Sequence, residues 1–132
     1  MNTFKNTAAR RVWLLAVALA GSAVVSPAFA ACNPNARVQS ASQTLPELTS
    51  GSPTIVHLDG SSSTPKNGNL SFSWQYLGSV PAGYAVTLTN PNTALPTFAS
   101  PDVGPAGATL NFRMTVLCQG ETSTATTAIR MK

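Results

Sequence analysis

Residues 58–75 read LDGSSSTPKNGNLSFSWQ, which joins the end of one apolar segment to a second segment through a polar run. The second segment, residues 70–77, alternates strictly between apolar and polar side chains. Its apolar members are Leu70, Phe72, Trp74 and Tyr76. Successive side chains of a β-strand point to opposite faces, so this period of two residues predicts a strand with one buried face. The polar run before it is typical of a turn between two strands.

The same pattern recurs along the rest of the chain after residue 31. Short β-rich segments alternate with clusters of Pro, Gly, Ser and Asn, and no segment keeps the period of a helix. The expected strands are 36–41, 54–59, 70–77, 84–89, 97–99, 109–118 and 122–131. About seven strands in roughly 100 residues are typical of an immunoglobulin-like β-sandwich, so we predict an all-β fold of this class.

The first thirty residues predict export from the cell. Lys5, Arg10 and Arg11 precede an apolar run at 12–25, and Ala-Phe-Ala at 28–30 is typical of a cleavage site. We therefore expect a signal peptide at 1–30 and one domain at 31–132. The alternative is an uncleaved membrane anchor, but the apolar run is shorter than the roughly 20 residues of a spanning helix. No transmembrane segment is expected in the mature chain.

Removal of this leader would leave a nearly neutral protein. Three of the eight basic residues lie in the leader, so five remain against four acidic residues, and the net charge becomes about +1. The remaining Lys and Arg residues form no cluster in the sequence. This charge distribution disfavours nucleic acid and anionic membrane surfaces as partners.

The chain has two cysteines, Cys32 and Cys118, and both lie after the predicted leader. An even number of cysteines in an exported protein favours a disulfide. Such a bond would close a long loop and could contribute about 4 kcal/mol to stability. The alternative is lipid attachment at Cys32, which follows small residues. Phe29 stands three residues before it, where bacterial lipoproteins normally carry Leu or a similar aliphatic residue.

Several of these segments together resemble the PKD (polycystic kidney disease) domain family. They are VHLDGSSS at 56–63, LSFSWQ at 70–75, GSVPAG at 78–83, VTLTN at 86–90, PTFASPDV at 96–103 and LNFRMTVLC at 110–118. The resemblance spans 33–132 and keeps the order of the family's strands. It implies two packed β-sheets and a non-catalytic extracellular module that serves as a spacer, an adhesion element or an accessory binder of protein or carbohydrate.

A calcium site is one candidate for a functional site. Asp59 could ligate the ion together with Asn67, Asn69 or Asp102, because calcium prefers six or more oxygen ligands. The family commonly carries an acidic turn after its LDGS stretch, whereas residues 64–69 read TPKNGN here. The competing interpretation is that Asp59 accepts backbone hydrogen bonds and thereby stabilises the turn. We favour that structural role, and we expect no cofactor.

Catalysis has weaker support in the sequence. His57 and Asp59 share one strand face close to Ser61, but a triad needs the acid behind the histidine and the serine in front of it. The sequence contains no G-x-S-x-G nucleophile elbow and a single histidine. A secreted hydrolase is therefore only an alternative, and we expect a protein that is not an enzyme.

A binding site is more consistent with the loops than with the strands. Trp74 could stack on a sugar, but its parity with Phe72 predicts a core position. Pro81 and Tyr84, in the loop 78–84, are the candidate contact residues. We thus expect an exported accessory, adhesion or binding module, periplasmic or extracellular, whose partner is a protein or a carbohydrate. A lipid-anchored envelope protein attached through Cys32 is the alternative.

Overall fold

The computed structural model describes residues 31–39, 42–45 and 52–132, so the predicted signal peptide at 1–30 lies outside the described residues. Within these ranges every regular element is a strand, which confirms the predicted all-β class. The strands are β1 Ser42–Leu45, β2 Ile55–His57, β3 Ser71–Val80, β4 Leu88–Thr89, β5 Thr97–Ala99, β6 Ala108–Cys118 and β7 Glu121–Met131. A search of the same ranges finds no helix that could cross a membrane.

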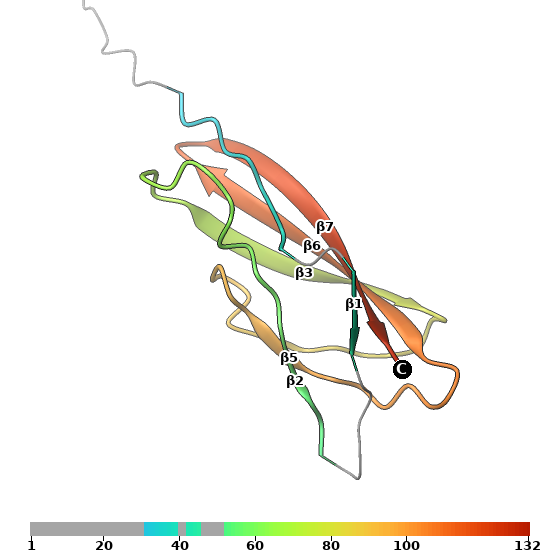
Figure 1. Cartoon of the computed structure of the whole chain (residues 1–132). Coiled ribbons are helices and arrows are strands. Elements are labelled where there is room, and N and C mark those ends of the chain that lie inside the picture. Colours follow the sequence, from blue (N-terminus) through green and yellow to red (C-terminus); the bar gives the residue numbers. More distant parts are fainter. Residues whose placement is uncertain (1–30, 40–41, 46–51) are drawn as a thin grey trace, which may run out of the picture.

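The strands form two sheets. A four-stranded sheet has the order β1-β7-β6-β3, and a three-stranded sheet has the order β2-β5-β4. All pairs are antiparallel except β1 with β7, which is parallel. Figure 1 shows the long strands β3, β6 and β7 side by side, with β2 and β5 in a separate layer. The long strands therefore supply most of the surface on which a site could be built.

The core lies between the two sheets and is filled by the residues that alternation assigned to the inner faces. Every second residue of β6 from Ala108 to Cys118 is buried. Phe112 of the large sheet contacts Phe98 of the small sheet, with ring centroids 5.0 Å apart. Trp74 is only 5% exposed, so its predicted core position is confirmed. Its indole Nε1–H donates to the Thr93 carbonyl at 3.0 Å, which satisfies the one polar group of the ring.

Two expected strands differ from the structure. The described part of 36–41 forms only one isolated bridge, Gln39 with Asp59; a second, Asn35 with Thr64, lies just before it, and the strand β1 begins after it. The reason is that the Arg37 N–H is bonded to the Ser63 hydroxyl instead of to a neighbouring strand. The expected strand at 84–89 shrinks to β4, since the Tyr84 carbonyl accepts a hydrogen bond from the Tyr76 hydroxyl.

The contact between the two sheets should dominate stability. We expect Phe112→Ala to lower the free energy of unfolding by about 3–5 kcal/mol, because Phe112 is fully buried and its removal leaves a cavity between the sheets. Urea unfolding of the oxidised protein measures this loss. Thr124→Ala, on an exposed position of β7, is the control and should change the free energy by less than about 0.5 kcal/mol. Equal losses in the two variants would contradict the assignment of the core.

Candidate functional site

The outer face of the large sheet is formed by the outward side chains of β3, β6 and β7. Residues that pair directly across antiparallel strands share a face, so the register sorts these side chains into rows that cross the strands. The first row consists of Gln75, Arg113 and Thr126. The middle row consists of Gly78, Asn111 and Ala128. The third row consists of Val80, Thr109 and Arg130.

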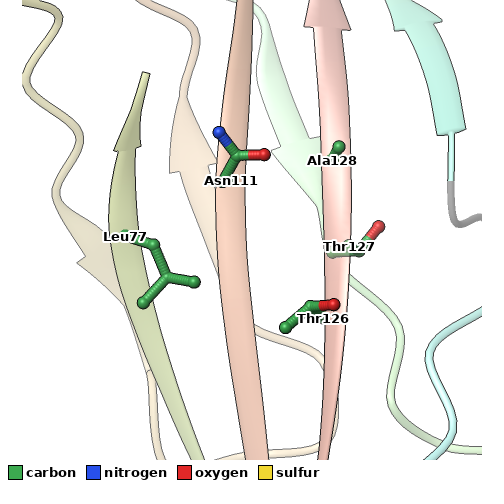
Figure 2. Close-up of a pocket in the computed structure, with 5 residues that line it drawn as sticks. All are labelled: Leu77, Asn111, Thr126, Thr127 and Ala128. Carbon is green, nitrogen blue, oxygen red and sulfur yellow. The ribbon is translucent and has the colours of Figure 1, made fainter. Parts of the chain in front are cut away.

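A hollow of about 570 Å³ lies over the middle row. It is lined by Leu77, Asn111 and residues 126–128, which come from three neighbouring strands (Figure 2). The hollow exists because Gly78 and Ala128 are small, whereas the rows on both sides carry long side chains. The register also shifts between Tyr76 and Gly78, so Leu77 is an extra residue at a bulge and projects beside the hollow.

Charge on the outer face has one sign. Arg113 and Arg130 are both exposed and lie in the rows on either side of the hollow. The described acidic residues are Asp59, Asp102 and Glu121, and none of these three belongs to the outward positions of β3, β6 or β7. Asn111 lies in the row between those of the two arginines, and Thr126 is opposite Arg113. The face can therefore offer hydrogen bonds to hydroxyl groups and ion pairs to anions.

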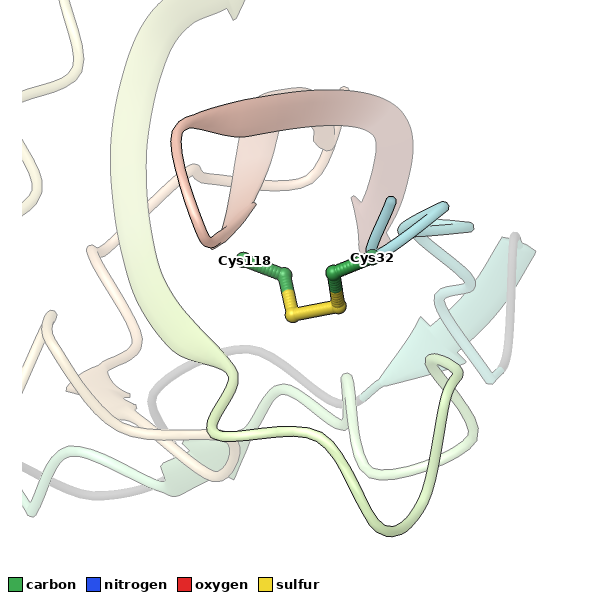
Figure 3. The surroundings of a disulfide bond; sticks show 2 residues. All are labelled: Cys32 and Cys118. Carbon is green, nitrogen blue, oxygen red and sulfur yellow. A yellow bond between two sulfur atoms is a disulfide. The ribbon is translucent and has the colours of Figure 1, made fainter. Parts of the chain in front are cut away.

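The disulfide joins the two ends of the domain. Cys32 and Cys118 are bonded across a sequence separation of 86, with their Cα atoms 5.7 Å apart (Figure 3). This confirms the predicted pairing. Lipid attachment through Cys32 is wrong, because a thioether-linked lipid needs the same sulfur that Cys118 holds. The bond lies at the end of β6, where Cys118 is 1% exposed.

The turn at 64–69 packs against this disulfide. A Cβ atom added at Gly68 would lie 3.2 Å from the Cys118 Sγ and 3.3 Å from the Cys32 Sγ. Asn67 and Gly68 line a hollow of about 440 Å³ together with Cys32 and Gln119. Lys66 donates to the Ser61 carbonyl. The turn is thus held by the disulfide and by its own side chains.

The four calcium candidates are not brought together. Asp59 and Asp102 follow opposite ends of the β2–β5 pair, which places them about 20 Å apart at the usual rise per strand residue. Each carboxylate accepts a backbone N–H in its own turn, from Ser61 at 2.8 Å and from Gly104 at 3.2 Å. Asn67 lies beside the disulfide, and Asn69 is an exposed residue just before β3. The described ranges hold no group of three or more His, Cys, Asp or Glu residues placed for a metal.

The loop candidates have different surroundings. Tyr84 is half-buried, and its hydroxyl donates to the Val103 carbonyl at 3.0 Å. Its N–H donates to the Ser79 hydroxyl at 3.3 Å, so the residue ties the loop to the body of the domain. Pro81 is exposed and lines a shallow hollow of about 150 Å³ next to Arg130. His57 is exposed on β2 opposite Thr97, while the Asp59 carboxylate is directed to its own turn.

Sequence reasoning missed the outer face. The alternation along β6 and β7 could have indicated which polar residues face outward, because both strands were correctly expected. The outward residues include Asn111, Arg113, Thr126 and Arg130. Parity alone does not say which residues of the two strands are opposite each other. The register Thr109 to Arg130 and Arg113 to Thr126 is what places the two arginines on opposite sides of the hollow.

Comparison with known proteins gives a likeness of fold. No family model and no curated protein matches the chain. Among solved structures, it is similar to a nucleoside hydrolase-related hypothetical protein from Saccharophagus degradans that is associated with carbohydrate metabolism. The TM-score is 0.53 at 19% identity, over 75% of this chain and 25% of that chain. This chain therefore spans a quarter of the length of that protein, and the likeness concerns the fold alone.

Loss of the disulfide should be costly. We expect the double variant Cys32→Ala/Cys118→Ala to lose about 4 kcal/mol of unfolding free energy, because its unfolded chain is no longer closed into a loop. Urea unfolding followed by the fluorescence of buried Trp74 measures the loss. Dithiothreitol should lower the unfolding midpoint of the native protein and leave that of the double variant unchanged. A native midpoint that does not respond to dithiothreitol would contradict the account.

Calcium should leave the protein unchanged. Because the candidate ligands are separated in space, we expect the melting temperature to move by less than about 1 °C between millimolar calcium and excess chelator, since only a ligand that binds the folded state stabilises it. Asp59→Asn keeps the side-chain acceptor for Ser61, so it should be more stable than Asp59→Ala by about 1 kcal/mol. A calcium-dependent rise of several degrees that Asp59→Asn abolishes would show a site.

Proposed function

We propose that this protein is an exported, non-catalytic module of the PKD-like, immunoglobulin-like type that binds carbohydrate at the cell envelope or outside the cell. The observation that carries the proposal is the hollow on the outer face, which is lined by the Thr126 hydroxyl, the Asn111 amide and the apolar Leu77. The rows on either side of it add the guanidinium groups of Arg113 and Arg130. Such groups are suited to a ligand with many hydroxyls, because each can donate or accept a hydrogen bond.

Strand order supports the immunoglobulin-like assignment. In that fold, the second, fifth and fourth strands form one sheet, and the third, sixth and seventh form the other. The orders β2-β5-β4 and β3-β6-β7 follow this division. The first strand pairs in parallel with the last, at the edge of the large sheet. The PKD-like branch of this fold is proposed on the sequence segments that resemble it.

Export is supported by the disulfide. Disulfides persist in oxidising compartments, and the bond between Cys32 and Cys118 is largely buried. Cys32 lies two residues after the expected cleavage site at 28–30. The mature chain would therefore be covalently tied to β6 close to its first residue. We propose a signal peptide at 1–30 and a mature domain at 31–132 on these grounds. The location, periplasmic or extracellular, is part of the same proposal.

A carbohydrate is favoured over a protein as the partner for two reasons. The hollow is lined by the polar groups of Asn111 and Thr126 beside a single exposed aliphatic residue, Leu77, whereas protein interfaces usually centre on several aromatic or aliphatic anchors. The solved structure with the similar fold is described as associated with carbohydrate metabolism, and the likeness covers a quarter of that chain. A domain that corresponds to a quarter of one such longer protein fits an accessory role.

Binding without turnover is the test of this proposal. The oxidised protein is run through affinity gels that contain a panel of neutral and acidic soluble polysaccharides, and the same mixtures are assayed for newly formed reducing ends. We expect retardation in at least one gel and no release of sugar. Migration unaffected by every polysaccharide would overturn the proposed function, and so would release of reducing ends that follows the protein through purification.

A further inference from the structure

Resting on this proposed function, we propose that the hollow on the outer face binds an acidic polysaccharide, with Arg113 and Arg130 each pairing with a carboxylate of the sugar chain. The two arginines are 17 positions apart in sequence, but the register places Arg130 opposite Thr109 and Arg113 opposite Thr126. They therefore lie on either side of the middle row. From strand rise and spacing, their Cα atoms are about 14 Å apart.

The surroundings of the two arginines leave their charges available. Within the part of the chain that the structure describes, neither guanidinium makes an ion pair or a side-chain hydrogen bond. The nearest described carboxylate in sequence, that of Glu121, has the inward parity of β7 and lies by Cys32 at the other end of the strand. Among the described outward side chains of β3, β6 and β7, a ligand carboxylate thus meets two cations and no competing anion. Arg binds carboxylates with two parallel N–H bonds, which orients the ligand as well as attracting it.

The floor of the hollow fits the uncharged part of a sugar chain. Leu77 is 43% exposed at the bulge and offers an apolar contact to a ring face. Asn111, whose side-chain Nδ2 also donates to the Gly78 carbonyl at 3.4 Å, lies in the row between those of the arginines, and Thr126 is opposite Arg113. Gly78 and Ala128 leave room for the backbone of a linear polymer to run across the strands.

Other occupants fit this face less well. The outward positions of β3, β6 and β7 carry no aromatic residue, so a neutral glycan would lack the ring stacking that usually supports its binding. A second copy of the chain would bring arginines against arginines, which is unfavourable. Nucleic acid has a dense row of phosphates, for which two separated cations are too few. A polymer with carboxylates along its length can offer one carboxylate to each of the two separated cations.

The experiment measures binding of polygalacturonate by isothermal titration calorimetry, with a neutral β-glucan and a sulfated polysaccharide as comparison ligands. The protein is expressed with its full sequence and purified in the oxidised form. We expect polygalacturonate to bind, with an affinity that falls about tenfold between 50 and 500 mM salt, because exposed ion pairs are screened. The double variant Arg113→Gln/Arg130→Gln should lose about tenfold or more. Arg37→Gln removes one positive charge from an exposed residue of the bridging segment at 35–39 and should bind as the native protein does, whereas each single variant, Arg113→Gln or Arg130→Gln, should bind more weakly.

The outcomes separate this inference from the proposed function. Polygalacturonate affinity that is unchanged in the double variant, or equal affinity for the neutral β-glucan, overturns the acidic ligand and leaves a carbohydrate-binding module. Tighter binding of the sulfated polysaccharide overturns the choice of carboxylate. Absence of binding to all three ligands overturns the inference, and the wider panel of polysaccharides then decides the proposed function. An unchanged urea midpoint in the double variant shows that loss of binding is not loss of folding.

Discussion

The alternation along β6 is the constraint on which both faces of the molecule depend. This strand lies between β3 and β7, and its inward residues Leu110, Phe112, Met114 and Val116 are fully buried against the small sheet. Its outward residues Asn111 and Arg113 form part of the outer face. Because a strand has a period of two, a slip of one residue would exchange the two sets. The burial of the core therefore fixes which polar groups are displayed, and the register with β7 fixes how far apart they are.

The disulfide extends the same constraint to the end of the domain. Cys118 has the inward parity of β6, so its sulfur points to the side where Cys32 and the turn at 64–69 meet. The turn that resembles an ion-binding loop in sequence is thus occupied by contacts to the disulfide, with Gly68 close to both sulfur atoms. A polar run between strands does not need a ligand to explain it when Asp59, Ser63 and Lys66 all bond to neighbouring backbone groups. This leaves the outer face as the surface with polar groups available for a partner.

Much of the fold could be predicted from the sequence, because a period of two residues directly reports burial in long strands. The predictions for β3, β6 and β7, the core position of Trp74 and the pairing of Cys32 with Cys118 follow from that period and from the even number of cysteines. The short elements could not be predicted in the same way. At Arg37 and Tyr84, side chains distant in sequence take the backbone groups that a strand would use. The separation of the calcium candidates could not be predicted for a related reason, since the sequence does not give the strand register that separates Asp59 from Asp102.

The register of β6 with β7 places two basic residues that are distant in sequence, Arg113 and Arg130, on either side of a hollow. The proposed binding of an acidic polysaccharide depends on this pair. Backbone amide chemical shifts, followed by NMR during titration of the oxidised protein with polygalacturonate oligomers, test it most directly. We expect shifts confined to the neighbourhood of the hollow, at Leu77, Asn111, Arg113, Ala128 and Arg130, with the inner face and the turn at 64–69 unmoved. Shifts that cluster instead around Tyr84 and Val103, or on the exposed side of β2, with Arg113 and Arg130 unmoved, would contradict it.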